Sequence, residues 1–322
     1  MIEEQEQPSF RTYEGPRATD APLLAVAIGA SAGGLDALRD LLSSLSSSDG
    51  MAFVIVEHMD STAKSLLPSI LAQFTALPVS EISEGQRLVP DQVFVAPPNA
   101  LVEIDKTDFR LSPIEVGDKR QAPIDALFRS LAASFGTRAV GVILSGGGSD
   151  GMVGVQQIAH EGGMTLAQQP ESAKHAGMPR SAIATGVVDH VLTPSEMARE
   201  LSAYVRHVGD LAVEPGALAG YDAVLQTLPE ICDLLQKATE HNFKHYKTST
   251  LVRRIQRRIQ VLRLGASQAY VERLRRDPEE LHQLFRELLI GVTSFFRDSA
   301  AFDVLSVEVV QRLMAQRRHD PL

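Results

Sequence analysis

The feature that most constrains the fold is an alternation of short apolar segments with longer helical segments between residues 22 and 207. The apolar segments are almost continuously hydrophobic, as parallel strands are when helices cover both faces of their sheet. The expected strands are residues 23–28, 52–56, 92–96, 139–144, 164–167 and 187–192. The expected helices between them are residues 33–47, 61–76, 123–135, 151–162 and 194–207. This order predicts an α/β fold with a doubly wound, mainly parallel sheet.

A second unit is expected after residue 208, where the strand pattern stops. Residues 209–220 contain glycine and proline, as linkers do. The remaining chain predicts helices only, at residues 222–240, 248–264, 267–276, 278–291 and 298–318. We therefore expect a disordered tail (1–21), an α/β domain (22–207), a linker (208–221) and a small all-α domain (222–322).

Composition narrows the class of protein. The 322 residues include one cysteine, Cys232, so no disulfide can form within the chain, and a reducing compartment is indicated. The sequence contains neither a signal-peptide core nor an apolar run of about 20 residues, so we expect a cytoplasmic protein. The net charge of −9 is uneven, because residues 241–322 carry 15 Lys and Arg against 9 Asp and Glu. This change of sign suggests that the two units have different partners.

Three of the expected strands are followed by residues that can do chemistry. Ser31 follows the first strand in GASAGG, His58 follows the second in EHMD, and Asp150 follows the fourth in SGGGSDGM. Because the carboxyl ends of parallel strands lie at one edge of a sheet, we expect the three side chains to meet there. A serine, a histidine and an aspartate are the parts of a nucleophilic triad.

The residues around Ser31 also fit the G-x-S-x-G pattern of a sharp strand-to-helix turn that exposes a serine hydroxyl. The helix that follows would offer backbone N–H groups and its positive dipole end to an oxyanion. The chain order Ser–His–Asp differs from the Ser–Asp–His order of α/β-hydrolases, which argues against that particular fold. Phosphate binding is disfavoured, because Ser31 replaces the second glycine of G-x-G-x-x-G and neither glycine-rich loop contains GK[ST].

Five motifs occur in the order IGASAGG, EHM, VFVAPPN, VGVILSGGGSDGMVG and AGMPRSAI. Through them, the segment from about residue 22 to 207 resembles the catalytic domain of the bacterial chemotaxis protein-glutamate methylesterases. The resemblance implies that Ser31 is the nucleophile, His58 the general base and Asp150 its orienting carboxylate. The implied reaction is hydrolysis of γ-glutamyl methyl esters on the cytoplasmic helices of chemotaxis receptors, with deamidation of glutamines there. No cofactor is implied for it.

The resemblance also implies an oxyanion site made by the backbone N–H groups of Ala32 and Gly147. That family usually has threonine and methionine at these two positions, and a backbone N–H survives either change. Its familiar members carry a receiver domain in front of the catalytic domain. Only about 21 residues precede the domain here, so we expect regulation by another route.

The helical unit contains a strongly basic segment, HNFKHYKTSTLVRRIQRRIQVLRLG. One helical stripe of the expected helix carries Leu251, Ile255, Ile259 and Leu262. Its other faces carry Arg253, Arg254, Arg257 and Arg258. From the pattern alone, this predicts a packed helix with a solvated basic side. Nucleic-acid binding is disfavoured, because aromatic residues are not interleaved with the arginines.

Residues 241–310 also resemble the helical N-terminal domain of the chemotaxis receptor methyltransferases, through FKHYKTSTLVRRIQRRI and LLIGVTSFFRD. The resemblance implies that Thr293 and Arg297 lie near the methyl group of S-adenosylmethionine, and that the four arginines face an acidic receptor. No glycine-rich cofactor motif follows them. We therefore expect a truncated methyltransferase that does not bind S-adenosylmethionine unless the missing domain is supplied, and that serves as a receptor-docking module.

Two alternatives to the esterase hypothesis remain open. The first is a scaffold or binding module of a chemosensory system with weak or no catalytic activity. A scaffold has no physical need for all three triad residues, so their presence favours the enzyme. The second alternative is a hydrolase of some other ester or amide.

Overall fold

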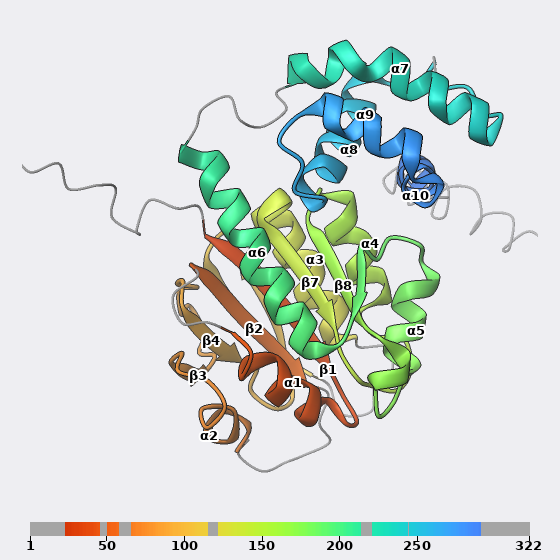
Figure 1. Cartoon of the computed structure of the whole chain (residues 1–322). Helices are drawn as coiled ribbons and strands as arrows, with labels where there is room; N and C mark the ends of the chain where they lie inside the picture. Colours follow the sequence, from red (N-terminus) through yellow and green to blue (C-terminus); the bar gives the residue numbers. More distant parts are fainter. Residues whose placement is uncertain are drawn as a thin grey trace, which may run out of the picture.

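In the computed structural model, the described residues are 23–45, 50–57, 66–114, 122–213, 221–243 and 245–290. Within them a seven-stranded sheet has the order β3-β4-β2-β1-β7-β8-β9, and every neighbouring pair is parallel (Figure 1). Its strands are β1 (Leu24–Ala30), β2 (Met51–Glu57), β3 (Val79–Glu81), β4 (Gln92–Val95), β7 (Ala139–Ile143), β8 (Met164–Gln168) and β9 (His190–Leu192). A separate antiparallel hairpin joins β5 (Ala100–Asp105) to β6 (Asp108–Pro113).

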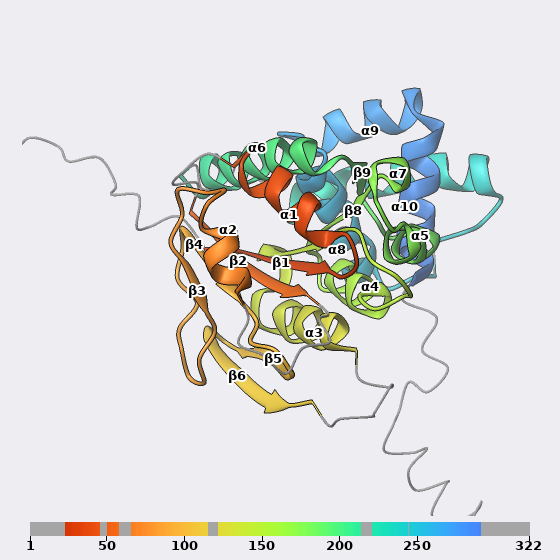
Figure 2. The same ribbon diagram turned by 90° about the horizontal axis from the view of Figure 1, so that it is seen from below.

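Helices cover both faces of the sheet, as Figure 2 shows from below. One face packs against α1 (Gly34–Leu42), α2 (Leu67–Leu71) and α6 (Pro194–Val213). The other face packs against α3 (Pro123–Phe135), α4 (Met152–His160), α5 (Gly177–Ala184) and the β5–β6 hairpin. The predicted doubly wound α/β fold is confirmed.

The central strand β1 shows why its sequence is continuously apolar. All seven of its residues are buried. Leu24, Val26 and Ile28 face the α1 and α6 layer, whereas Ala25 and Ala27 face the α3 layer. Small residues on the second face let α3 approach closely: a Cβ added at Gly29 would lie only 2.4 Å from a side-chain carbon of Ile124 in α3.

The six predicted strands are all present, although the last is limited to residues 190–192. Three strands and one helix were not predicted, namely β3, β5, β6 and α5. Helix α2 covers only Leu67–Leu71 of the helix expected over residues 61–76. Residues 61–65 of that expected helix lie outside the described residues. Helix α6 continues to Val213, six residues beyond its predicted end.

The second unit is built from α7 (Tyr221–Thr239), α8 (Thr248–Val261), α9 (Ser267–Arg276) and α10 (Pro278–Ile290). Its core contains the predicted stripe of α8, because Leu251, Ile255 and Ile259 are buried and Leu262 packs against them. The predicted helix over residues 298–318 and the predicted tail over residues 1–21 lie outside the described residues.

Candidate active site at the carboxyl edge of the sheet

Ser31 directly follows β1 in a turn that only glycine permits. The chain reverses at Gly33, whose φ of 73° lies in the left-handed region, and α1 begins at Gly34. The Gly34 N–H donates to the Ser31 carbonyl at 2.8 Å. A Cβ at Gly33 would lie 2.7 Å from Cβ of Lys174, and one at Gly34 would lie 2.7 Å from Cβ of Ala30. The two glycines therefore place Ser31 at the N-terminus of α1, half-exposed.

Strand order makes this position the switch point of the sheet. From β1 the chain builds the sheet outward through β2 and β4, and later returns to the other side of β1 with β7 and β8. In doubly wound sheets, binding crevices lie outside the carboxyl ends of the strands where this reversal occurs. Ser31 follows β1 and Asp150 lies in the loop after β7, so the two residues flank that point.

The Asp150 carboxylate is fixed by the N-terminus of α3. Its Oδ2 accepts the Ile124 N–H at 3.1 Å, and its Oδ1 accepts the Asp125 N–H at 3.0 Å. The positive end of the helix dipole stabilises a negative charge in this position. A carboxylate oxygen can accept more than one hydrogen bond, so these contacts with α3 are compatible with a role in orienting an imidazole.

A second aspartate makes the opposite contact: Asp125, at the start of α3, accepts a hydrogen bond from α4. Oδ1 of the buried Asp125 accepts the Gly154 N–H of α4 at 2.7 Å. Burial raises the pKa of the Asp125 carboxyl, as does the neighbouring charge of Asp150, while the Gly154 N–H opposes both. The two aspartates therefore tie the N-terminal turns of α3 and α4 together beneath the site.

His58 is the next residue after Glu57, the last residue of β2, and lies outside the described residues. Glu57 pairs in register with Ala30, the residue before Ser31. The Glu57 carboxyl is half-buried, and burial raises its pKa above the ordinary value. This carboxyl is close to the serine turn, since its Oε1 would lie 3.6 Å from a Cβ at Gly34. Glu57 was not among the site residues predicted from the sequence.

The glycine-rich loop after β7 packs against the segment that contains AGMPRSAI. Gly146 donates its N–H to the His175 carbonyl and accepts the Met178 N–H, both at 2.9 Å. A Cβ at Gly146 would lie 2.1 Å from the Met178 sulfur and 3.0 Å from the Ser31 Cβ. Glycine is thus required where the loop passes the serine. Gly147, a predicted oxyanion residue, is exposed beside it, as is Ala32.

A cavity of about 530 Å³ opens next to the serine turn. It lies between α1, the segment after β8 and the start of α6. Its lining includes Gly33, Asp36, Asp40, Glu171, Lys174 and Thr193. Most of the residues that line it are polar or charged.

Among the described residues, no group of three or more His, Cys, Asp or Glu side chains is placed to bind a metal ion. None of the helices described there has the length and apolar character needed to cross a bilayer.

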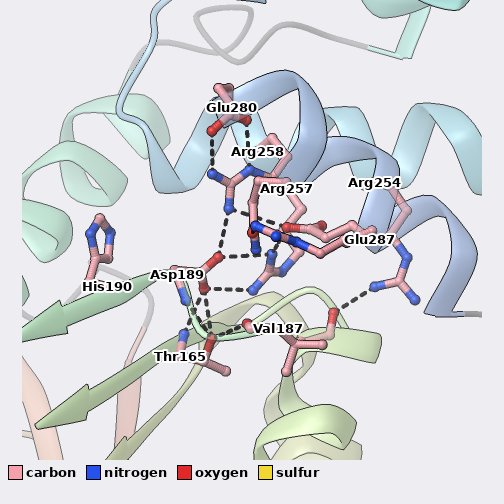
Figure 3. A network of polar contacts seen from close by, with 12 residues as sticks. Thr165, Val187, Asp189, His190, Arg254, Arg257, Arg258, Glu280 and Glu287 are labelled. Atoms are coloured by element: carbon pink, nitrogen blue, oxygen red, sulfur yellow. Dashed lines mark hydrogen bonds and ion pairs between the residues drawn. The ribbon is translucent and has the colours of Figure 1, made fainter. Parts of the chain in front are cut away.

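The arginines of α8 do not form the solvated basic side that the sequence predicted. Arg254, Arg257 and Arg258 are 2–3% exposed, and of the four arginines only Arg253 is exposed. Figure 3 shows the buried three at the contact between α8 and the α/β domain. The prediction that these three arginines present a surface to a receptor is therefore wrong. Sequence spacing placed them on shared faces but could not tell whether water or protein covers those faces.

Their partners come from both units of the chain. Asp189, which precedes β9, accepts hydrogen bonds from Arg257 Nη2 and Arg258 Nη1, each at 2.7 Å. In α10, Glu287 accepts from Arg257 at 2.5 Å, and Glu280 accepts from Arg258 Nη2 at 2.6 Å (Figure 3). We call this set, together with Arg254, the arginine network. Arg257 and Arg258 contact its three carboxylates, whereas Arg254 donates to a backbone carbonyl.

Two carboxylates of the arginine network, Asp189 and Glu287, have pKa values shifted in opposite directions. Burial alone would raise the pKa of Asp189, but Arg257 and Arg258 outweigh burial and hold it below the ordinary value. Burial dominates at Glu287 and raises its pKa. Among the described atoms, Glu287 Oε2 is buried without a hydrogen-bond partner, which agrees with this direction.

The arginine network lies at the edge of the sheet opposite Ser31. Arg254 donates to the Ala159 carbonyl at 2.6 Å, and Arg257 donates to the Gly163 carbonyl just before β8 begins. The carboxyl end of β8 is Gln168, on the side of the serine turn. Figure 1 accordingly shows α8 against one end of the sheet and α1 at the other. Thr293 and Arg297, the predicted cofactor contacts, lie outside the described residues.

A serine on a glycine-bounded strand-to-helix turn at the switch point of a doubly wound sheet, with an aspartate that caps α3 at the same edge, is typical of an α/β domain with hydrolase chemistry. The family of this domain can also be identified. The chain belongs to the CheB methylesterase family, because the model of that family matches residues 26–201. The family model for the CheR methyltransferase all-alpha domain matches residues 226–289.

Individual relatives are similar over about half of the chain or more. A protein-glutamate methylesterase/protein-glutamine glutaminase of Geobacter sulfurreducens is 38% identical over 180 residues, which are 55% of this chain and 48% of that protein. An uncharacterized 104.1 kDa protein of Rhodobacter capsulatus is 38% identical over 272 residues, 78% of this chain. The chain spans 28% of that protein, and thus less than half the length of either relative.

A solved structure is also similar. The catalytic domain of the Thermotoga maritima CheB methylesterase superimposes with a TM-score of 0.53 and 27% sequence identity. The match covers 56% of this chain and 98% of that one. The α/β domain therefore corresponds to a complete catalytic domain of this family.

Proposed function

We propose that this chain is a protein-glutamate methylesterase that hydrolyses γ-glutamyl methyl esters on the cytoplasmic helices of chemotaxis receptors. Glutamine deamidation at the same site is the matching reaction on an amide. The observation that carries the proposal is the placement of Ser31 at the switch point, on the edge where Asp150 is fixed by α3. Family membership supplies the substrate class. A cytoplasmic location follows from the substrate.

In the proposed reaction, the Ser31 hydroxyl attacks the ester carbonyl while His58 accepts its proton. The tetrahedral oxyanion receives hydrogen bonds from the N–H groups of Ala32 and Gly147. Collapse of this intermediate breaks the ester C–O bond, and methanol leaves with the proton from His58. Water then attacks the acyl-serine, and His58 again accepts and returns a proton. Asp150 stabilises the imidazolium.

No cofactor takes part in these reaction steps, because serine, imidazole and water supply the nucleophiles and transfer the protons that the hydrolysis needs. The polar cavity beside Gly33 supports a polypeptide substrate, since it offers room next to the nucleophile for the residues that flank a glutamyl ester. The arginine network does not support receptor docking through α8, because its side chains are already paired within the chain.

The decisive experiment measures methanol release from methylated receptor by the purified chain and by a Ser31→Ala variant. We expect the variant to lose about 10⁴-fold or more in rate while keeping the circular dichroism of the wild type, because Ser31 lies at a half-exposed turn. A fluorophosphonate probe should label the wild type and not the variant. Near wild-type methanol release by Ser31→Ala would contradict the proposal. A wild type without any activity or labelling would favour the scaffold hypothesis.

A further inference from the structure

Ser145 is a buried polar residue at the carboxyl edge of the sheet, and the proposed reaction gives it no role. It follows β7 by two positions and precedes the glycine-rich loop, and its relative exposure is 0%. Its N–H donates to Oε1 of Gln168, itself buried at the carboxyl end of β8, at 2.8 Å. The backbone of Ser145 is therefore held by the neighbouring strand.

Ser145 contacts the serine turn through two of its own oxygens. Its backbone carbonyl accepts the Ser31 N–H at 3.0 Å. Its hydroxyl Oγ lies 2.9 Å from the Ala32 carbonyl oxygen and donates to it. Between these two bonds, the Ser31 carbonyl accepts the Gly34 N–H at 2.8 Å. Three successive peptide groups of the turn are thus each fixed by one hydrogen bond.

The direction of the hydroxyl proton is also determined. The His175 N–H donates to Ser145 Oγ at 2.9 Å, so the hydroxyl acts as an acceptor there. Its one proton can go to the Ala32 carbonyl at 2.9 Å or to the His175 carbonyl at 3.4 Å. The shorter contact is favoured, and the His175 carbonyl already accepts the Gly146 N–H at 2.9 Å. The hydroxyl thus accepts a hydrogen bond from the His175 N–H and donates its own proton to the Ala32 carbonyl.

Fixing the carbonyls fixes the N–H groups that face the substrate. In a trans peptide the C=O and the following N–H point in opposite directions. The Ser31 carbonyl points to the Gly34 N–H, so the Ala32 N–H points away from the first turn of α1. The Ala32 carbonyl points to Ser145, so the Gly33 N–H points away from Ser145. Alanine at position 32 has no hydroxyl that could hold this turn itself.

We propose that Ser145 is a positioning residue. Its hydroxyl holds the Ala32–Gly33 peptide, and together with the bond from the Gly34 N–H to the Ser31 carbonyl this fixes the backbone of Ala32 on both sides, and so the direction of the Ala32 N–H that stabilises the oxyanion. This inference rests on the proposed function of Ser31. Because the N–H groups of an oxyanion site act in the transition state more than in substrate binding, loss of their orientation lowers kcat and leaves KM unchanged.

The test compares Ser145→Ala and Ser145→Thr with a matched control, Ser130→Ala. The Ser130 hydroxyl also makes two hydrogen bonds, donating to the Leu127 carbonyl at 2.9 Å and accepting the Ile104 N–H at 3.0 Å. The first bond lies within α3 and the second links α3 to β5, away from the serine turn. Methanol release from methylated receptor gives kcat and KM, and thermal unfolding gives Tm for each variant.

We expect Ser145→Ala to lower kcat about 10- to 100-fold with KM unchanged, since a small misplacement of reacting groups has effects of this size. Ser145→Thr retains the hydroxyl and should restore kcat to within about fivefold of the wild type. Ser130→Ala should lower Tm about as much as Ser145→Ala does and leave kcat unchanged. This pattern separates orientation of the turn from general stability.

Three outcomes would overturn the proposal: Ser145→Ala with a wild-type kcat, a loss confined to KM, or Ser145→Thr as slow as Ser145→Ala. The Ser31→Ala variant is measured in parallel to test the underlying function. If Ser31→Ala is inactive and Ser145→Ala is fully active, only the role of Ser145 fails. If Ser31→Ala remains active, the esterase proposal itself fails.

Discussion

Removing the charge of Asp189 tests whether the arginine network holds the two units together. The Asp189 side chain is fully buried and shares its oxygens between Arg257 and Arg258. An Asp189→Asn variant keeps the size of the side chain, but Arg257 and Arg258 then contact two carboxylates instead of three. The asparagine amide would also direct its own donors toward guanidinium donors.

The size of the effect follows from what each arginine retains. Removal of one partner from a buried pair costs about 3–5 kcal/mol. After the substitution, Arg257 still contacts Glu287 and Arg258 still contacts Glu280, so we expect the lower end, about 3 kcal/mol. That free energy corresponds to a roughly 100-fold change in an opening equilibrium.

Hydrogen exchange of the α8 amides is the appropriate assay, because global unfolding of two units is not a two-state process. We expect these amides to exchange about 100-fold faster in Asp189→Asn, with little change in β1. The matched control is Asp36→Asn, whose exposed carboxylate pairs with Arg39 at 3.3 Å. Exposed pairs contribute about 0–1 kcal/mol, so the control should leave α8 exchange nearly unaltered.

The result that would refute this reasoning is equal protection of α8 in the wild type and in Asp189→Asn. Such a result would mean that hydrophobic packing alone holds the helical unit. Addition of 1 M salt to the wild type gives a second check. Because the network is buried, salt should not reproduce the effect of the substitution.

Three further predictions concern the site and the helical unit. Asp150→Asn should lower methanol release by about 10⁴-fold and alter the ascending limb of the pH–rate profile that we assign to His58; an unchanged profile would argue against its role. Burial raises the pKa of Glu57 above its ordinary 4.5, so the folded state keeps that proton after the unfolded state has lost it. This group should therefore make wild-type stability fall as pH rises through the window above 4.5, and Glu57→Gln should make the fall in Tm smaller; pH–Tm curves of identical shape would contradict it. Calorimetry should detect no micromolar binding of S-adenosylmethionine to the 322-residue chain, and measurable binding would contradict this expectation.

Part of the fold was readable because its physical signal is local. The strands at the centre of the sheet are buried on both faces, so their sequences are continuously apolar and stand out from the helices. The β5–β6 hairpin was missed for the opposite reason. Its first strand alternates buried and exposed residues, and a two-residue turn at Lys106 joins the strands. This period-two pattern was present in the sequence but is shorter and weaker than a continuous apolar run.

Some residues of the candidate site could likewise be predicted from the sequence, and others could not. Ser31 and Asp150 could be proposed from sequence because glycine-rich turns after parallel strands are local patterns with a fixed place in the fold. Ser145 and Gln168 could not, because their role depends on hydrogen bonds between residues far apart in the chain. A polar residue at the end of a buried strand is the only sequence signal they leave.

The sequence by itself determined the parallel sheet, the serine turn and the apolar stripe of α8, since each depends on residues close together in the chain. Only the tertiary structure decided whether the arginines of α8 are buried or exposed. Spacing shows which side chains share a face of a helix, but the cost of burying a charge depends on its partners. For Arg257 and Arg258 these partners include Asp189, 68 and 69 residues earlier in the chain. Their arrangement converts an apparently solvated basic face into the contact that joins the two units.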